Sequence, residues 1–352
     1  MSADASHSHD GGTAPPLSAA RYSLWLSASL VAVLASLLAG LSFGESDVTL
    51  RALFSGGHVD PHLQLAMQLR LPRVLLAALV GGALALCGAA LQALVRNPLA
   101  DPYILGVSGG AALGGALWQA IGFSSALSWQ LGPFAAFAGA GLAALLVFRL
   151  ASRGERLYSL SLLLTGVMIN VFCSAAIMLI KTIVRPEKAQ ALLMWLMGSL
   201  AFESLELRHV GIVALIVLVG SAPLLLHARQ LNAMLLGDDQ AQSLGVAVRR
   251  VRIVVFAASS MLVGAAVSLT GMIGFIGLVV PHIMRLLCGP DHRLLFPVSA
   301  LVGATFLVLC DLAVRLIFRF LGHDFPVGVM TALIGGPLFV YLLRRHEPRV
   351  LV

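Results

Sequence analysis

Charged side chains are scarce in this sequence. Asp, Glu, Lys and Arg make up 11% of its 352 residues, while 59% are hydrophobic. An ordinary soluble domain carries roughly 25% charged residues, more than twice this share. The composition therefore excludes a soluble globular domain and predicts a protein that crosses a membrane several times.

Two further absences narrow the chemistry. No GxxxxGK[ST] phosphate loop occurs, so we expect the chain not to bind ATP in the P-loop manner and not to be an ATP-hydrolysing enzyme. No CxxC spacing occurs either, so neither a disulfide framework nor a metal site is indicated. We expect no resident cofactor and no nucleic-acid partner. The four cysteines are predicted to be small packing residues: Cys87, Cys173, Cys288 and Cys310.

Long apolar runs predict the number of membrane spans. Crossing a ~30 Å hydrocarbon core takes about 20 residues as helix, with every backbone group bonded inside the segment. The run 102–148 is too long for one span, so we expect a break at 122–133. The run 253–284 is expected to divide near Thr270. The prediction is an all-α polytopic protein of about ten spans, from the runs 22–44, 74–95, 102–148, 157–180, 210–228, 253–284 and 325–343, with 294–320 if Asp311 and Arg315 are tolerated.

The basic residues indicate the orientation. With the N-terminus inside, 14 of the 23 lysines and arginines fall on the cytoplasmic side, which predicts that both termini are cytoplasmic. Residues 1–20 contain His7 and His9 but no apolar periodicity, and we expect a disordered tail. The membrane domain is predicted at 21–347, and its first span reads as an uncleaved helix rather than a signal peptide.

One segment is polar where its surroundings are apolar. Residues 235–252, LLGDDQAQSLGVAVRRVR, separate two hydrophobic blocks. We expect two short cytoplasmic helices that meet something in water. The first would end at Gly237, and the second would be capped by Asp239, with Gln242 at its third position and Gly245 as its stop.

Three motifs carry a resemblance to a known family. RNPLADP at 96–102 follows a glycine-rich span and precedes GVSG at 106–109. TGMIGFIGLVVPH at 270–282 and PVGVMTALIG at 326–335 come later in the chain. In this order, over roughly residues 24–345, the sequence resembles the permease subunits of ABC importers for ferric siderophores, haem and cobalamin.

The resemblance implies partners and a place in the cell. It implies a homodimer of ten-span permeases in the bacterial inner membrane, two cytoplasmic ATPase subunits that use ATP, and a periplasmic substrate-binding protein. It also places coupling helices at about 229–250, which would sit in a cleft of the ATPase. The candidate coupling residues are Leu235, Leu236, Gly237, Asp238, Asp239, Gln240, Leu244 and Gly245.

Three arginines are candidates for docking the binding protein. Arg70 and Arg73 lie three residues apart, just before a long span and on one helical face. In the family, arginines at the positions of Arg70, Arg73 and Arg315 receive acidic residues of the binding protein. An alternative for the first two is that they reach lipid headgroups. Arg315 follows Asp311 by four residues and could neutralise it, so we expect a dual role there.

Basic residues also favour an anionic cargo. Lys181, Arg185 and Lys188 follow the fifth span and would form a cationic outer vestibule. This favours an iron-containing chelate, haem before a ferric siderophore, with cobalamin as the alternative. Met194 and Met197 could face a haem plane, although methionines in apolar helices are usually packing residues. The candidate path residues are Lys181, Arg185, Met194 and Met197.

Two other classes of membrane protein share single features with this chain. GVSG also matches the GxSG of rhomboid proteases, with Ser108 as nucleophile and His282 as base. Asp311 within a span is also compatible with an ion-coupled secondary transporter. Both are less favoured, because ten spans do not suit a rhomboid and because no second carboxylate joins Asp311.

Overall fold

The computed structural model describes residues 19–43, 61–121, 128–153, 156–157, 159–200, 205–322 and 325–345. The expected tail falls outside these residues up to position 18, including His7 and His9.

The described chain is almost entirely helical, which confirms the all-α prediction. Within the described residues, seven helices are long and apolar enough to cross a membrane: α1 (Ala19–Ser42), α3 (Pro61–Val95), α5 (Ser128–Ala151), α6 (Ser159–Ile183), α8 (Leu207–Leu226), α11 (Val248–Thr270) and α13 (His292–Leu321). Three shorter helices account for the remaining predicted spans: α4 (Val107–Ile121), α12 (Ile276–Cys288) and α14 (Val327–Arg345).

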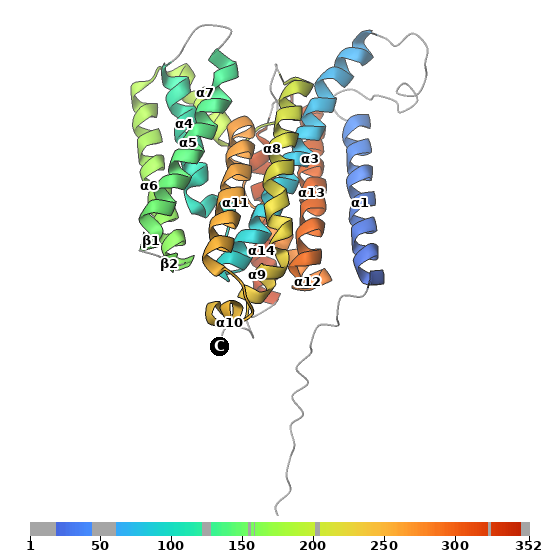
Figure 1. Ribbon diagram of the computed structural model, residues 1–352. Helices are drawn as coiled ribbons and strands as arrows, with labels where there is room; N and C mark the ends of the chain where they lie inside the picture. Colours follow the sequence, from blue (N-terminus) through green and yellow to red (C-terminus); the bar gives the residue numbers. More distant parts are fainter. Residues whose placement is uncertain are drawn as a thin grey trace, which may run out of the picture.

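Short elements connect these helices. A 3-10 turn, η1 (Pro102–Leu105), precedes α4, and a two-residue antiparallel pair, β1 (Ser152–Arg153) with β2 (Arg156–Leu157), joins α5 to α6. The other three are α7 (Pro186–Leu196), α9 (Ala228–Met234) and α10 (Asp238–Ser243). Figure 1 shows α7 at one end of the bundle and α9 and α10 at the other. We call these the α7 end and the α10 end.

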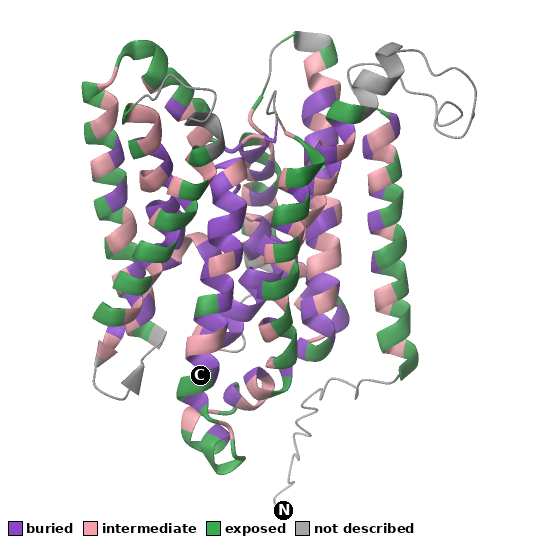
Figure 2. Ribbon diagram, turned by 45° about the horizontal axis from the view of Figure 1, so that its top comes forward, coloured by how far each residue is buried: buried purple, intermediate pink, exposed green. Residues whose placement is uncertain are grey.

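Helices α3 and α11 lie at the centre of the bundle. In their most apolar stretches 78% and 72% of the residues are buried, against 17% to 22% in α1, α5, α6 and α8. Figure 2 shows this division as buried central ribbons and exposed outer ones. The outer helices present leucine, valine and phenylalanine to the surroundings, as expected where the surroundings are lipid.

Helix α3 begins earlier than its apolar run predicts. It starts at Pro61, so Arg70 and Arg73 lie inside the helix rather than before it. The expectation that they precede the span is therefore wrong. An apolar run marks the part of a helix that lipid or protein surrounds, and the helix continues beyond that part because its backbone bonds remain satisfied.

The two predicted breaks have different outcomes. Helix α11 ends at Thr270, and Gly271 and Phe275 adopt left-handed φ angles of 67° and 70° before α12, which confirms the break near Thr270. The other predicted break, 122–133, reaches too far along the chain: 122–127 lie outside the described residues, and the residues from 128 on are helical. Helix α5 already begins at Ser128 and contains Pro133, because a proline near the start of a helix removes few backbone bonds.

Glycines allow the backbones of neighbouring helices to come into direct contact. A Cβ atom on Gly88 of α3 would lie 1.8 Å from the carbonyl oxygen of Gly277 in α12. A Cβ on Gly81 would lie 2.3 Å from the carbonyl oxygen of Gly303 in α13, and one on Gly139 at 2.3 Å from that of Gly110. Such contacts replace the hydrophobic drive that lipid does not supply between helices.

We expect Gly88→Ala to destabilise the protein by about 1–3 kcal/mol, because α3 and α12 must separate to admit the methyl group. Thermal unfolding in detergent, followed with a thiol-reactive dye, measures the change, since all four cysteines are buried in the folded chain. The control is Gly141→Ala, where an added Cβ meets nothing within 4 Å. Equal melting temperatures for the two variants would contradict the proposed contact.

Candidate functional site

The first family motif forms a junction between helices. The carboxylate of Asp101 accepts a hydrogen bond of 2.7 Å from the backbone N–H of Tyr103 and caps η1. Burial raises the pKa of Asp101 to about 6, although this bond favours the charged form. The hydroxyl oxygen of Tyr103 accepts a bond of 2.9 Å from the N–H of Ile273. The first motif therefore holds the second one, in the link between α11 and α12.

The second and third motifs meet beside α7. The N–H of Gly328 donates to the carbonyl of Gly198 at 3.2 Å, and the N–H of Ser199 donates to that of Thr270 at 2.8 Å. A Cβ on Gly328 would lie 2.1 Å from the Met197 carbonyl oxygen. The residues after α7 are thus wedged between the end of α11 and the start of α14.

The short helices at the α10 end are present, but their caps differ from the prediction. Helix α10 begins at Asp238, and its N-cap is Gly237 with φ 127°, so Asp239 lies inside the helix and does not cap it. Asp238 and Asp239 both occupy the first turn, where negative charge favours the helix dipole. Gly245 adopts φ 83° directly after the helix ends, in the place expected for its stop.

Asp238 binds two arginines of its own chain. Its carboxylate accepts hydrogen bonds from Arg252 at 2.9 and 2.7 Å and a further bond from Arg96. Arg96 follows the last residue of α3, and Arg252 lies in the second turn of α11. The predicted anchor for a partner is therefore engaged within the chain.

Helix α9 is fixed to a different helix. The amide of Asn232 donates to the Asp291 carboxylate at 2.8 Å and accepts from the N–H of His292 at 3.0 Å, where α13 begins. Burial alone would raise the pKa of Asp291, but hydrogen bonds from Arg293 and Asn232 lower it to about 2. The carboxylate therefore remains charged throughout the physiological range.

An apolar surface remains open beside these joints. Leu235, Leu236 and Leu244 are 44%, 62% and 65% exposed, and Asp239 and Gln240 are exposed next to them. Leu235 and Leu236 lie between α9 and α10 and Leu244 directly follows α10, so these exposed leucines lie outside the candidate membrane spans. The surface of Leu235, Leu236, Asp239, Gln240 and Leu244 is hereafter the α10 surface.

The three candidate docking arginines lie around the end of α1, toward the α7 end. Asp311 is fully buried and accepts from Arg73 at 2.8 Å and from Arg315 at 3.0 Å. Arg315 also donates to the carbonyls of Gly40 and Phe43 at 2.9 and 3.2 Å. Gly40 lies in the last turn of α1 and Phe43 directly follows it, where carbonyl groups have no partner within the helix. Asp311 and Arg315 therefore pair, as their spacing predicts.

Arg70 joins this cluster from α3. Its guanidinium lies 3.5 Å from the carbonyl oxygen of Leu41, and the side chain is buried. Arg70, Arg73 and Arg315 thus gather around Asp311 and the end of α1. The cluster fastens α1, α3 and α13 together.

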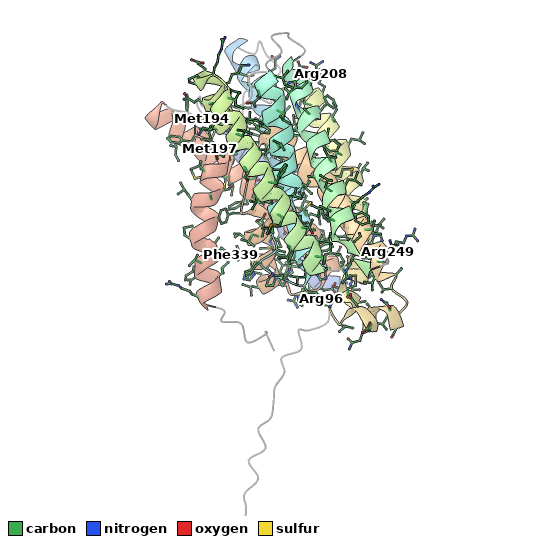
Figure 3. The ribbon with its side chains drawn as sticks, turned by 90° about the vertical axis from the view of Figure 1, so that its left-hand side faces the viewer. Arg96, Met194, Met197, Arg208, Arg249 and Phe339 are labelled. Carbon is green, nitrogen blue, oxygen red and sulfur yellow. The ribbon has the colours of Figure 1, made fainter. Side chains whose placement is uncertain are left out.

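The candidate path residues lie near the α7 end. Arg185 is exposed at the N-cap of α7, Lys181 is half-buried in the last turn of α6, and Met194 and Met197 are 48% and 45% exposed. Figure 3 shows both methionines near the α7 end of one face, with Phe339 lower on that face and Arg96 at the α10 end. The methionines are thus available for contact rather than packed into the core.

Ser108 does not have the surroundings of a protease nucleophile. Its hydroxyl donates to the carbonyl of Tyr103 at 3.1 Å, and that carbonyl also accepts from Asn170 at 2.6 Å. The ring of His282 instead packs edge-on against Phe339, with centroids 5.8 Å apart. The serine holds the turn between η1 and α4 in place.

Several residues of these joints escape prediction from the sequence. Each of them forms a hydrogen bond with a residue that is not its neighbour in the sequence: Asn232, Asp291, Arg96, Arg252, Tyr103 and Asn170. Arg96 and Tyr103 could have been singled out because they lie in or next to RNPLADP. Nothing in the spacing of Asn232 or Asn170 indicates their partners.

Comparisons with known proteins agree with this architecture. Residues 30–345 match the model of the FecCD transport family. A cobalamin import system permease protein of Halobacterium salinarum is 44% identical over 283 residues, which cover 80% of this chain and 74% of the relative. A hemin transport system permease protein of Yersinia pestis is 38% identical and covers 93% of this chain and 97% of its own length.

A solved structure is also similar. A transporter described as a metal-chelate type ABC transporter, in an inward-facing conformation, superposes with a TM-score of 0.81 at 32% sequence identity. The match covers 92% of this chain and all of the other.

We expect Asp311→Asn to destabilise the protein by about 3–5 kcal/mol, because it removes the carboxylate that pairs with the buried Arg315 and the half-buried Arg73. Thermal unfolding in detergent measures the loss. The control is Glu206→Gln, which breaks an ion pair with Arg208 whose two side chains are more than half exposed. That change should cost at most about 1 kcal/mol. A melting temperature for Asp311→Asn equal to that of the control would show that the buried cluster is not structural.

Proposed function

The chain belongs to the FecCD transport family, and from this premise we propose that it is the membrane-spanning subunit of an ATP-driven importer that carries an iron-containing chelate into the cytoplasm. Membership confirms the resemblance seen in the three motifs and makes the protein an ABC transporter permease rather than an enzyme. The proposed cargo is haem first and a ferric siderophore second.

The proposed assembly contains two copies of this chain, two cytoplasmic ATPase subunits and a periplasmic binding protein. In it the membrane domain, residues 21–347, lies in the inner membrane with both termini in the cytoplasm. The α10 end then faces the cytoplasm and the α7 end faces the periplasm. The excess of lysine and arginine on the cytoplasmic side supports this orientation.

The observation that carries the proposal is the α10 surface. Three exposed leucines beside exposed Asp239 and Gln240 form an apolar patch with a polar rim, which is the composition of a protein contact. We propose that the ATPase covers this patch. Gly237 and Gly245 shape the surface, because both adopt backbone angles that favour glycine.

The arginine cluster at the α7 end supports docking of the binding protein. Arg70, Arg73 and Arg315 gather three guanidinium groups around the end of α1, and guanidinium groups bind carboxylates through charge-assisted hydrogen bonds. Charge complementarity of this kind sets the orientation and the rate of association more than the affinity. In this proposal Arg73 and Arg315 serve both docking and the fastening of α1.

The cargo proposal rests on charge and on the methionines. Lys181, Arg185 and Lys188 gather where α6 ends and α7 begins, and Arg185 and Lys188 are exposed. They favour an anion such as haem, whose propionates carry charge, and the exposed Met194 and Met197 suit an apolar ring face. Cobalamin is the second candidate, because a cobalamin permease is 44% identical to this chain.

We expect Leu236→Asp together with Leu244→Asp to detach the ATPase or to uncouple ATP hydrolysis from transport, because the two charges would be buried in the contact. Co-purification with the ATPase and uptake into proteoliposomes measure both effects. Gln242→Asp is the control, since it adds the same charge at an exposed polar position of α10. Normal assembly and normal uptake in the double variant would place the ATPase contact elsewhere.

We expect Arg185→Ala to reduce haem uptake into proteoliposomes several-fold, with basal ATP hydrolysis close to normal, because the vestibule loses an exposed cation. The matched control is Arg208→Ala, which removes another exposed arginine, one already paired with Glu206. Parallel assays with a ferric siderophore and cobalamin identify the cargo. Unchanged haem uptake would remove Arg185 from the pathway, and uptake of cobalamin alone would favour the second candidate.

A further inference from the structure

One carboxylate joins α10 to both central helices. Asp238 is the first residue of α10, and it accepts from Arg252 through both of its oxygens and from Arg96 through one. Charge-assisted bonds of this kind are short, directional and stronger than neutral ones. A displacement of α10 therefore pulls on two other segments at once.

The two arginines belong to the helices that form the core of the bundle. Arg252 is buried and lies in α11, while Arg96 directly follows α3 and opens the RNPLADP motif. Arg96 adopts a left-handed φ of 55°, which is uncommon for a residue with a side chain. The turn that brings its guanidinium to Asp238 is therefore built at some conformational cost.

Helix α9 is attached to another part of the bundle. Asn232 joins it to Asp291 and His292 at the start of α13, and only residues 235–237 separate α9 from α10. Leu235 and Leu236 lie in this link, and Leu244 directly follows the last residue of α10. A partner seated on them would press between two separate attachments.

We propose that Asp238 is a positioning residue that transmits the movement of the ATPase from α10 to α3 and α11. The inference rests on the proposed function, because it presumes that the ATPase covers the α10 surface. It assigns to Asp238 a role within its own chain, in contrast to the exposed Asp239 and Gln240, which remain available to the partner.

Three variants test this role in proteoliposomes that contain the permease, its ATPase and its binding protein. We call the contact of Asp238 with Arg96 and Arg252 the clamp. Asp238→Asn removes its negative charge, and Arg252→Gln removes one of its two positive charges. Arg96→Gly removes the other guanidinium group. Glycine also adopts the left-handed φ of this turn without strain, so we expect the variant to be no less stable than the unaltered protein. Arg149→Gln is the control, because Arg149 is an exposed arginine in the last turn of α5 and lies outside the segment 229–250.

We expect the three clamp variants to retain the ATPase and to hydrolyse ATP, while the cargo carried per ATP falls roughly tenfold. The control should transport as the unaltered protein does. If the clamp were merely structural, the variants would lose stability and ATPase binding together. Arg96→Gly distinguishes a structural role from a role in transmission, because its melting temperature should stay near that of the unaltered protein.

Two results would overturn the inference. The first is that Asp238→Asn carries as much cargo per ATP as the unaltered protein. If Asp238→Asn fails to assemble, the same result in Arg96→Gly would overturn the inference. The other is a loss of transport that matches the loss of bound ATPase. Failure of the proposed function would give a different result, because the unaltered protein itself would then neither bind the ATPase nor transport cargo.

Discussion

A carboxylate near each end of α3 fixes this helix to its neighbours. Asp311 of α13 binds Arg73 toward the α7 end, and Asp238 of α10 binds Arg96 at the α10 end. Asp238 also holds Arg252 of α11, and Arg315, which pairs with Asp311 within α13, donates to the Gly40 carbonyl of α1. Helix α3 thus connects the proposed docking site for the binding protein with the proposed contact for the ATPase.

The rest of the bundle relies on close packing rather than on charge. Lipid supplies no hydrophobic force between helices, so stability comes from backbone approach at glycines such as Gly88 and Gly277. Such contacts fix the distance between helices but are weakly directional. The ion pairs and the hydrogen bonds of Tyr103 and Asn232 add direction, and they lie where the family motifs and the short helices meet.

The sequence predicts the spans better than their ends. Apolar length gives the membrane-spanning segments and the division of α11 from α12, because the thickness of a membrane limits each crossing. It misplaces the start of α3 and the extent of the break before α5, since helical hydrogen bonding continues past the apolar run. The sequence pattern also assigns the N-cap of α10 to Asp239. In the structure Gly237 is the N-cap, and Asp238, the first residue of the helix, reaches the arginines.

The sequence by itself determined the class of protein, its helical architecture, the family and the candidate surfaces, because composition, apolar length and local motifs are properties of neighbouring residues. Only the tertiary structure decided what each charged residue binds. Asp238 and Arg96 are 142 positions apart, and Arg73 and Asp311 are 238 apart. The packing of the helices brings these groups together, and no local pattern in the chain encodes such distant pairs.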